Sequence, residues 1–114
     1  MELKGVTKEY PGSPPLRALN DVSLSIFEQD LVAVTGTSGS GKSTLLNIMG
    51  TLDRPTSGEI ILEGTRVAEL SDAQLAGLRS ARIGFVFQQF HLLEAVSAID
   101  NVATGLLYMG VSRA

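Results

Sequence analysis

The chain has 114 residues, a formal net charge of −3 and no cysteine. Its length is that of one domain at most, and its 44% hydrophobic and 18% charged residues are typical of a globular protein, which excludes a disordered tail. The lack of cysteine excludes a disulfide framework, and the negative charge gives no electrostatic footprint for nucleic acid. No signal peptide is expected at the N-terminus, and the longest uncharged stretch, residues 101–112, is shorter than the roughly 18 apolar residues of a membrane helix.

The N-terminal half predicts strands, a loop and a helix in that order. In residues 21–30 the apolar Val22, Leu24 and Ile26 alternate with Ser23 and Ser25, which is the period of a half-buried strand. Residues 31–35, LVAVT, form a continuous apolar run and predict a strand covered on both faces. After Lys42 the apolar side chains recur at helical spacing, at Leu45, Ile48, Met49 and Leu52.

Pro55 and Gly58 interrupt this helical pattern. Residues 59–62, EIIL, then predict a short strand that turns at Glu63 and Gly64 and returns through residues 65–68.

Two capping boxes predict helices in the C-terminal half, which run to about Arg82 and to Gly110: Ser71 with Gln74, and Ser97 with Asp100. Between these helices, residues 83–87 indicate a strand and residues 88–96 a loop without periodicity. The succession of strands and helices predicts an α/β fold.

The stretch GTSGSGKST, residues 36–44, predicts a phosphate-binding loop. It matches the pattern G-x4-G-K-[ST] between a predicted strand and a predicted helix. Its glycines allow backbone N–H groups to point at an anion, and the helix N-terminus adds a positive dipole end. The predicted nucleotide-binding residues are Gly36, Thr37, Ser38, Gly39, Ser40, Gly41, Lys42, Ser43 and Thr44.

Three side chains of this loop have separate expected roles. Lys42 supplies a charge for the β- and γ-phosphates, Ser43 a hydroxyl for Mg²⁺, and Thr44 a contact to the α-phosphate. The alternative is a flexible Gly/Ser loop, which would require four fixed positions to coincide by chance. The pattern therefore predicts a nucleoside triphosphate as ligand.

Four segments, in their order and spacing, resemble an ATP-binding-cassette (ABC) transporter ATPase of the branch that powers lipoprotein release and macrolide export: VTKEYP, ALNDVSLSI, GTSGSGKSTLLNIMGTLDRPTSGEIILEG and RIGFVFQQFHLL. The resemblance covers essentially the whole chain. It implies the N-terminal half of an α/β, P-loop NTPase: an antiparallel β subdomain, part of the RecA-like core and the start of the helical subdomain.

The resemblance also implies four regions within the chain. They are an antiparallel, adenine-contacting region (1–30), the phosphate-loop strand and helix (31–52), a segment leading to the Q-loop strand (53–87), and the Q-loop with the start of the helical subdomain (88–114).

Two further site residues follow from this resemblance. Tyr10 matches the aromatic residue that stacks on adenine, although it is alternatively a surface aromatic before Pro11. Gln88 matches the Q-loop glutamine, which approaches Mg²⁺ and the γ-phosphate; its alternative is an ordinary amide at the end of a strand. Residues 88–96 would contact the transmembrane subunit of the transporter. His91, the only histidine, is expected to be a loop or partner-contact residue.

Parts of the family pattern are missing from the 114 residues. No acidic residue from Asp53 onwards follows four apolar residues, as a Walker B aspartate does, and neither an LSGGQ-like signature nor a switch histidine occurs. No catalytic residue is therefore predicted, and the chain alone is expected to hydrolyse ATP negligibly. Because the family pairs the phosphate-loop strand with the Walker B strand, an exposed sheet edge is expected at residues 31–35.

By the same resemblance the full-length protein would be an ATPase that forms a homodimer around two ATP molecules, with Mg²⁺ as cofactor. It would lie in the cytoplasm, peripheral on the inner face of the cytoplasmic membrane. One alternative is a phosphate-loop GTPase or kinase, and the GTPase is disfavoured because D-x-x-G and N-K-x-D motifs are both absent. The other alternative, which remains open, is a short non-catalytic nucleotide-binding or interaction module.

Overall fold

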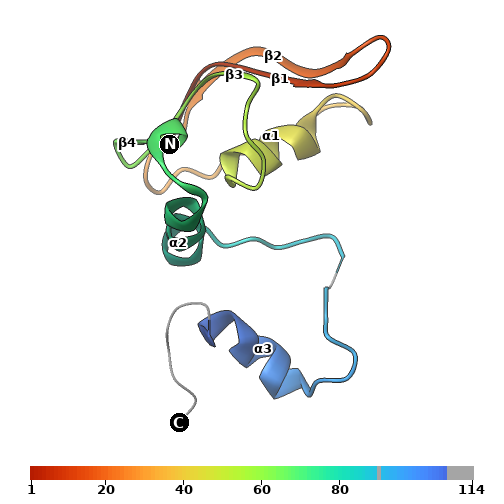
Figure 1. Ribbon diagram of the computed structural model, residues 1–114, viewed down its shortest axis with the longest axis vertical. Coiled ribbons are helices and arrows are strands. Elements are labelled where there is room, and N and C mark those ends of the chain that lie inside the picture. Colours follow the sequence, from red (N-terminus) through yellow and green to blue (C-terminus); the bar gives the residue numbers. More distant parts are fainter. Residues whose placement is uncertain (90, 108–114) are drawn as a thin grey trace. The chain divides into compact units, whose positions relative to one another are not determined.

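The computed structural model describes residues 1–89 and 91–107, which fall into two compact units (Figure 1). The first unit is Met1–Leu75, and the second begins at Ala76. In the described ranges, no helix is both long enough and apolar enough to cross a membrane.

A four-stranded antiparallel sheet, ordered β2–β1–β3–β4, forms the first unit. Its strands are β1 (Glu2–Tyr10), β2 (Leu16–Ser25), β3 (Ser57–Leu62) and β4 (Thr65–Arg66). The strand predicted from the alternation in residues 21–30 is confirmed by β2, which begins earlier, at Leu16. Val22 and Leu24 are half-buried while Ser23 and Ser25 are exposed, as this alternation requires.

The predicted turn between β3 and β4 is confirmed. Glu63 and Gly64 both have positive φ, 49° and 80°, which is the backbone of a two-residue type I′ hairpin. The returning strand is shorter than predicted, because β4 ends at Arg66 and a 3-10 helix, η1 (Val67–Glu69), follows.

Helix α1 (Lys42–Met49) lies against one face of this sheet (Figure 1). Its Leu45 and Ile48, one turn apart, are buried, and Ile48 has no exposed surface. The helix ends at Met49, with Gly50 as its C-cap, so the predicted Leu52 lies beyond it and is 45% exposed. The other core residues are Leu3, Val6, Leu19, Ile60, Leu62, Val67 and Leu75.

The first capping box is confirmed at the start of α2 (Asp72–Arg82). The backbone N–H of Ser71 donates to Gln74 Oε1 at 2.9 Å, and the N–H of Gln74 donates to Ser71 Oγ at 3.3 Å. These reciprocal bonds satisfy two N–H groups that the helix itself leaves unpaired. The helix begins in the first unit and continues into the second.

The second capping box begins α3 (Ala98–Leu107) in the second unit. Ser97 Oγ accepts a hydrogen bond from the N–H of Asp100 at 3.1 Å and donates one to Asp100 Oδ2 at 2.8 Å. The Asp100 carboxylate thus accepts from the Ser97 hydroxyl, whereas in the first capping box the Gln74 side chain accepts from a backbone N–H. The predicted extension of this helix to Gly110 lies outside the described residues.

The strands predicted at residues 31–35 and 83–87 are wrong, since neither segment belongs to a sheet. Leu31 and Val86 are fully exposed. An apolar run alone does not specify a strand, because a strand also needs a neighbour that pairs with its backbone, and no described strand does so. The expected sheet edge at residues 31–35 is therefore an exposed, unpaired segment. Within the other run, Phe85 and Phe87 stack at a centroid distance of 5.3 Å.

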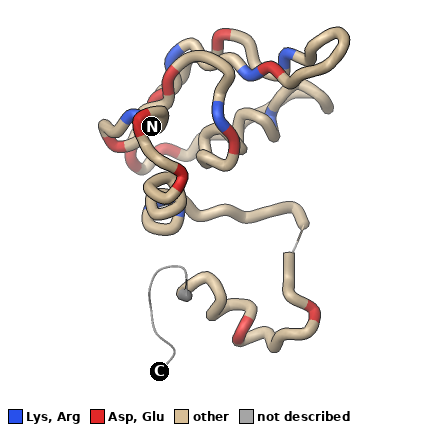
Figure 2. Tube along the Cα trace, in the orientation of Figure 1, with Lys and Arg blue, Asp and Glu red and all other residues tan. Residues whose placement is uncertain are grey.

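Charged residues of both signs are interspersed along the first unit (Figure 2). Two ion pairs join neighbouring strands, Arg17 to Glu9 at 3.1 Å and Arg66 to Glu59 at 3.0 Å. Partly exposed pairs of this kind contribute about 0.2–1 kcal/mol each. The apolar core therefore provides most of the stability of the sheet.

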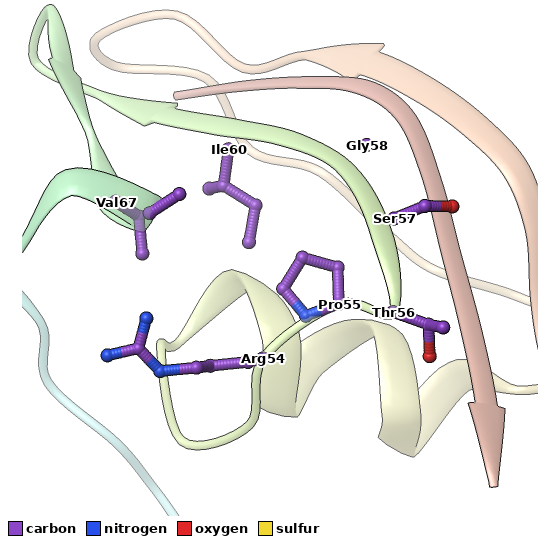
Figure 3. Close-up of a pocket in the computed structure, with 8 residues that line it drawn as sticks. Arg54, Pro55, Thr56, Ser57, Gly58, Ile60 and Val67 are labelled. Atoms are coloured by element: carbon purple, nitrogen blue, oxygen red, sulfur yellow. The ribbon is translucent and has the colours of Figure 1, made fainter.

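A small cavity of about 140 Å³ lies where the connection from α1 to β3 meets η1 (Figure 3). Pro55, Ile60 and Val67 surround it, and Arg54 is the one charged side chain in its lining. The Arg54 guanidinium donates to Asp72 Oδ1 at 2.9 Å, so its charge is already paired. The cavity is a gap in side-chain packing, and its lining residues do not form a cluster of reactive groups.

Candidate phosphate-binding site

The predicted loop curls directly into the N-terminus of α1, and two of its glycines are required sterically. A Cβ at Gly41 (φ 89°) would lie 2.4 Å from the carbonyl oxygen of Ala18 in β2. A Cβ at Gly36 would lie 2.6 Å from Ser40 Oγ. The loop therefore packs tightly on the sheet at one point and folds tightly on itself at another.

The side chain of Lys42 lies over the loop. Its ammonium group donates to the carbonyl oxygens of Gly36 at 2.9 Å and Thr37 at 2.6 Å, and it lies 3.5 Å from Ser40 Oγ. The only lysine of the loop is thus held where the backbone curls around it. A positive charge in this position attracts an anion that enters the loop.

The backbone donors of the loop are largely uncommitted. In the described structure a single hydrogen bond joins backbone groups within residues 36–41, from Ser40 N to Thr37 O at 3.3 Å. Gly41, the N-cap of α1, provides no side-chain cap. The N–H groups at this helix end, together with the helix dipole, are therefore suited to an anion.

A cavity of about 350 Å³ brings the loop together with the β1–β2 hairpin. The hairpin contributes Tyr10, Leu16, Arg17 and Ala18, and the loop and helix contribute Ser38, Gly39, Gly41, Lys42, Ser43 and Thr44. The structure thus places Tyr10 beside the phosphate loop. Leu16, Arg17 and Ala18 were not predicted, because no local motif marks them.

Tyr10 is held by two residues that the sequence analysis missed. Its hydroxyl donates to Asp53 Oδ2 at 3.0 Å, and the Lys8 ammonium lies 4.9 Å from its ring centroid. Lys8 also pairs with Asp53 Oδ1 at 2.6 Å. The hydrogen bond from Lys8 is the main reason that the pKa of Asp53 is lowered from its ordinary value of 3.8. The i, i+2 spacing of Lys8 and Tyr10 on one strand was the only sequence signal for this cluster.

Gln88 belongs to the second unit, where it is exposed in a bend after residues 83–87. The role of Gln88 therefore remains a prediction. His91, also exposed, packs edge-on against Phe87 at a centroid distance of 5.1 Å.

The loop that follows Gln88 is anchored to α3 by one side chain. Asn101 Oδ1 accepts a hydrogen bond from Leu93 N at 2.9 Å, and its Nδ2 donates to Leu93 O, Val96 O and Ser97 O at 3.0–3.2 Å. A groove of about 620 Å³ lies beside this anchor and is lined by Leu92, Leu93, Glu94, Val96, Ala98, Asn101 and Val102.

A glycine-rich loop that opens a helix and folds around a lysine defines a phosphate-binding-loop protein. The family model for the ABC transporter matches residues 19–113. The chain belongs to the ABC transporter family, as its motifs predicted.

The relatives agree with this assignment. The chain is 47% identical, over 115 residues, to a macrolide export ATP-binding/permease protein, MacB, of Photorhabdus laumondii, covering 100% of this chain and 18% of that protein. It is 47% identical over 112 residues to an uncharacterized ABC transporter ATP-binding protein of Thermotoga maritima, covering 97% of this chain and 48% of the relative.

A solved structure confirms the fold. The dimeric ATP-binding cassette MJ0796, in a post-hydrolysis state bound to ADP and Pi, superposes with a TM-score of 0.91 at 43% identity, covering 99% of this chain and 49% of that one. The predicted α/β fold of an ABC-type P-loop NTPase is therefore confirmed. The chain spans about half the length of this cassette and of the Thermotoga maritima relative.

Proposed function

We propose that this chain binds ATP, with the triphosphate in the loop of residues 36–44 and the adenine against Tyr10. The observation that carries the proposal is the cavity lined both by Tyr10 and by six residues of the loop and helix, Ser38, Gly39, Gly41, Lys42, Ser43 and Thr44. The uncommitted N–H groups, the helix N-terminus and Lys42 supply donors and positive charge for the phosphates. The Tyr10 ring supplies an apolar surface for a base.

Mg²⁺ is the proposed metal, and the donors present fit it. The Ser43 hydroxyl, in the first turn of α1, lines the cavity and offers the hard oxygen ligand that Mg²⁺ prefers. The amide oxygen of Gln88 is the second proposed ligand, carried over from the family. Bound Mg²⁺ would neutralise charge on the phosphate oxygens, while Ser43 holds its place at the loop.

We further propose that the whole protein hydrolyses ATP as the ATPase of a transporter. The relative from Photorhabdus laumondii is named for macrolide export and for a permease, and the matching solved cassette is a dimer. We propose a homodimer on the cytoplasmic face of the membrane, which these likenesses support in general terms. The 114 residues contain no Walker B aspartate or switch histidine, so the chain alone is expected to release phosphate negligibly.

The proposed contact with the transmembrane subunit is the segment of residues 88–96. Leu92 and Leu93 in this segment are more than half exposed, and both line the groove beside Asn101. A groove with exposed apolar side chains suits the apolar face of a partner helix. Glu94 also lines the groove and adds a negative charge.

The decisive experiment is calorimetric titration of the chain with Mg·ATP. Lys42→Ala removes the charge within the loop and is expected to weaken binding about 10- to 150-fold, the range for a hydrogen bond to a charged group. Lys4→Ala is the matched control, because Lys4 lies on β1 and pairs with Glu2. Equal affinity of the wild-type chain and Lys42→Ala would overturn the proposal.

Phosphate release from ATP is measured on the same preparations. Repeated turnovers that disappear in Lys42→Ala would contradict the expectation that the chain alone is catalytically incompetent.

A further inference from the structure

We propose that Lys8 and Asp53 are positioning residues, which hold the ring of Tyr10 as a fixed platform for the nucleotide base. This inference rests on the proposed function, since it presumes that Tyr10 receives the base. Neither Lys8 nor Asp53 lines the cavity, whereas Tyr10 does. Both would therefore act on the nucleotide through Tyr10 and not by touching it.

Asp53 is the centre of this arrangement. Its Oδ2 accepts the Tyr10 hydroxyl at 3.0 Å, and its Oδ1 accepts both the Lys8 ammonium at 2.6 Å and the N–H of Arg54 at 2.8 Å. The ion pair is largely sheltered, since the Lys8 side chain is 12% exposed. The carboxylate is thereby fixed from two sides, and the hydroxyl of Tyr10 is fixed by it.

Lys8 restrains the aromatic ring as well as the carboxylate. Its ammonium donates to Arg54 O at 2.7 Å and lies 4.9 Å from the ring centroid of Tyr10, a distance at which a cation is attracted to the ring. The ring is thus restrained at its hydroxyl and by a cation near its centre. A ring ordered in advance loses less side-chain freedom when a base stacks on it.

The position of Asp53 is set by the helix that begins at the phosphate loop. Leu52 N and Asp53 N both donate to Asn47 O in α1, at 2.8 and 3.3 Å. The helix therefore has the loop at its N-terminal end and Asp53 just past its C-terminal end. The spacing between the phosphate-binding loop and the Tyr10 ring is then determined by one short, packed helix and two hydrogen-bonded side chains.

The same contacts also tie β1 to the segment after α1, so a purely structural role is the competing explanation. The two roles differ in which ligand they affect. A loosened Tyr10 ring weakens ATP binding and leaves inorganic tripolyphosphate binding unchanged, because tripolyphosphate carries no base. A damaged fold weakens both.

The experiment is titration of the chain with Mg·ATP and with Mg·tripolyphosphate. Asp53→Ala is expected to weaken ATP binding about 3- to 10-fold, the fold-change that corresponds to ordering one side chain. Tyr10→Phe keeps the ring and removes its bond to Asp53, and it is expected to cause a similar loss. The double variant should show no further loss, because both changes break the same contact. Tripolyphosphate affinity should stay within about twofold throughout, the error of additive effects.

Glu59→Ala is the matched control, because it removes a carboxylate that pairs with Arg66 elsewhere in the same sheet. If Asp53→Ala fails to fold, Tyr10→Phe, which removes one oxygen atom, carries the test alone. Equal losses for ATP and tripolyphosphate, or no loss for ATP, would overturn the inference while the proposed function stands. A wild-type chain that binds neither ligand would overturn the proposed function and this inference with it.

Discussion

Gly41 and Ala18 approach so closely that a Cβ on the glycine would lie 2.4 Å from the alanine carbonyl oxygen. This contact joins the end of the phosphate loop to β2. We predict that Gly41→Ala lowers the free energy of unfolding by more than the roughly 1–2 kcal/mol that a left-handed backbone costs an ordinary residue, because the collision adds to it. Urea denaturation measures the change.

Gly39→Ala is the matched control for this prediction. Gly39 also has positive φ, 78°, but an added Cβ there meets nothing within 4 Å. Equal destabilisation by the two substitutions would mean that the approach to Ala18 has no energetic consequence.

The ion pair between Lys8 and Asp53 predicts a dependence of stability on pH. The pKa of Asp53 is lowered from 3.8 in the folded chain, so its contribution is fully present above 3.8 and is lost as the pH falls through the lowered value. Wild type should therefore exceed Asp53→Ala in stability near about pH 6, and the difference should shrink as the pH falls below 3.8. Denaturation curves at several pH values test this. A difference that grows on acidification would contradict the predicted sign.

Asn101 is predicted to order the loop that follows Gln88. Asn101→Ala removes the acceptor for Leu93 N and two amide protons that three carbonyl oxygens share, and a typical hydrogen bond contributes about 0.5–1.5 kcal/mol. Hydrogen exchange at the Leu93 amide should accelerate. Thr104→Ala is the control, because the Thr104 hydroxyl bonds Asp100 O within α3 and does not reach the loop. Unchanged exchange at Leu93 would contradict the anchor.

Gln88→Ala is predicted to leave ATP affinity nearly unchanged in this chain while weakening the coupling of hydrolysis to transport in the whole protein. Gln88 is exposed in the second unit, and in the proposed function the phosphates are bound mainly by the loop of residues 36–44. Calorimetry of Gln88→Ala beside Gln89→Ala, an exposed neighbour, measures the first half of this prediction. A loss of affinity as large as that of Lys42→Ala would contradict the assigned role.

Short sequence motifs were predicted well because the interactions that stabilise them join residues close together in the sequence. Ser71 with Gln74 satisfies helix donors within one turn, and Glu63 with Gly64 reverses the chain within two residues. The phosphate loop is equally local, since its lysine contacts carbonyl groups five and six residues away. For these hydrogen bonds and turns a short stretch of sequence contains both partners, whereas the approach of Gly41 to Ala18 depends on β2.

The structural features that were not predicted depend on contacts between residues far apart in the sequence. Residues 31–35 were predicted as a strand from their apolar run alone, yet a strand depends on a neighbour that the run does not specify. Lys8 and Asp53 are 45 residues apart and share no motif. Such contacts come from the packing of α1 on the sheet, which periodicity predicts only in outline.

The ammonium of Lys42 already has two oxygen partners, the carbonyls of Gly36 and Thr37. A phosphate that enters the loop must compete with them for the same three protons, so the affinity measured for ATP is that of an exchange and not of a simple addition. These two carbonyl groups thus compete weakly with phosphate for the Lys42 ammonium. A change that pulled those carbonyl groups away from Lys42 without disturbing the N–H groups would make the ligand bind more tightly than it does to the natural sequence.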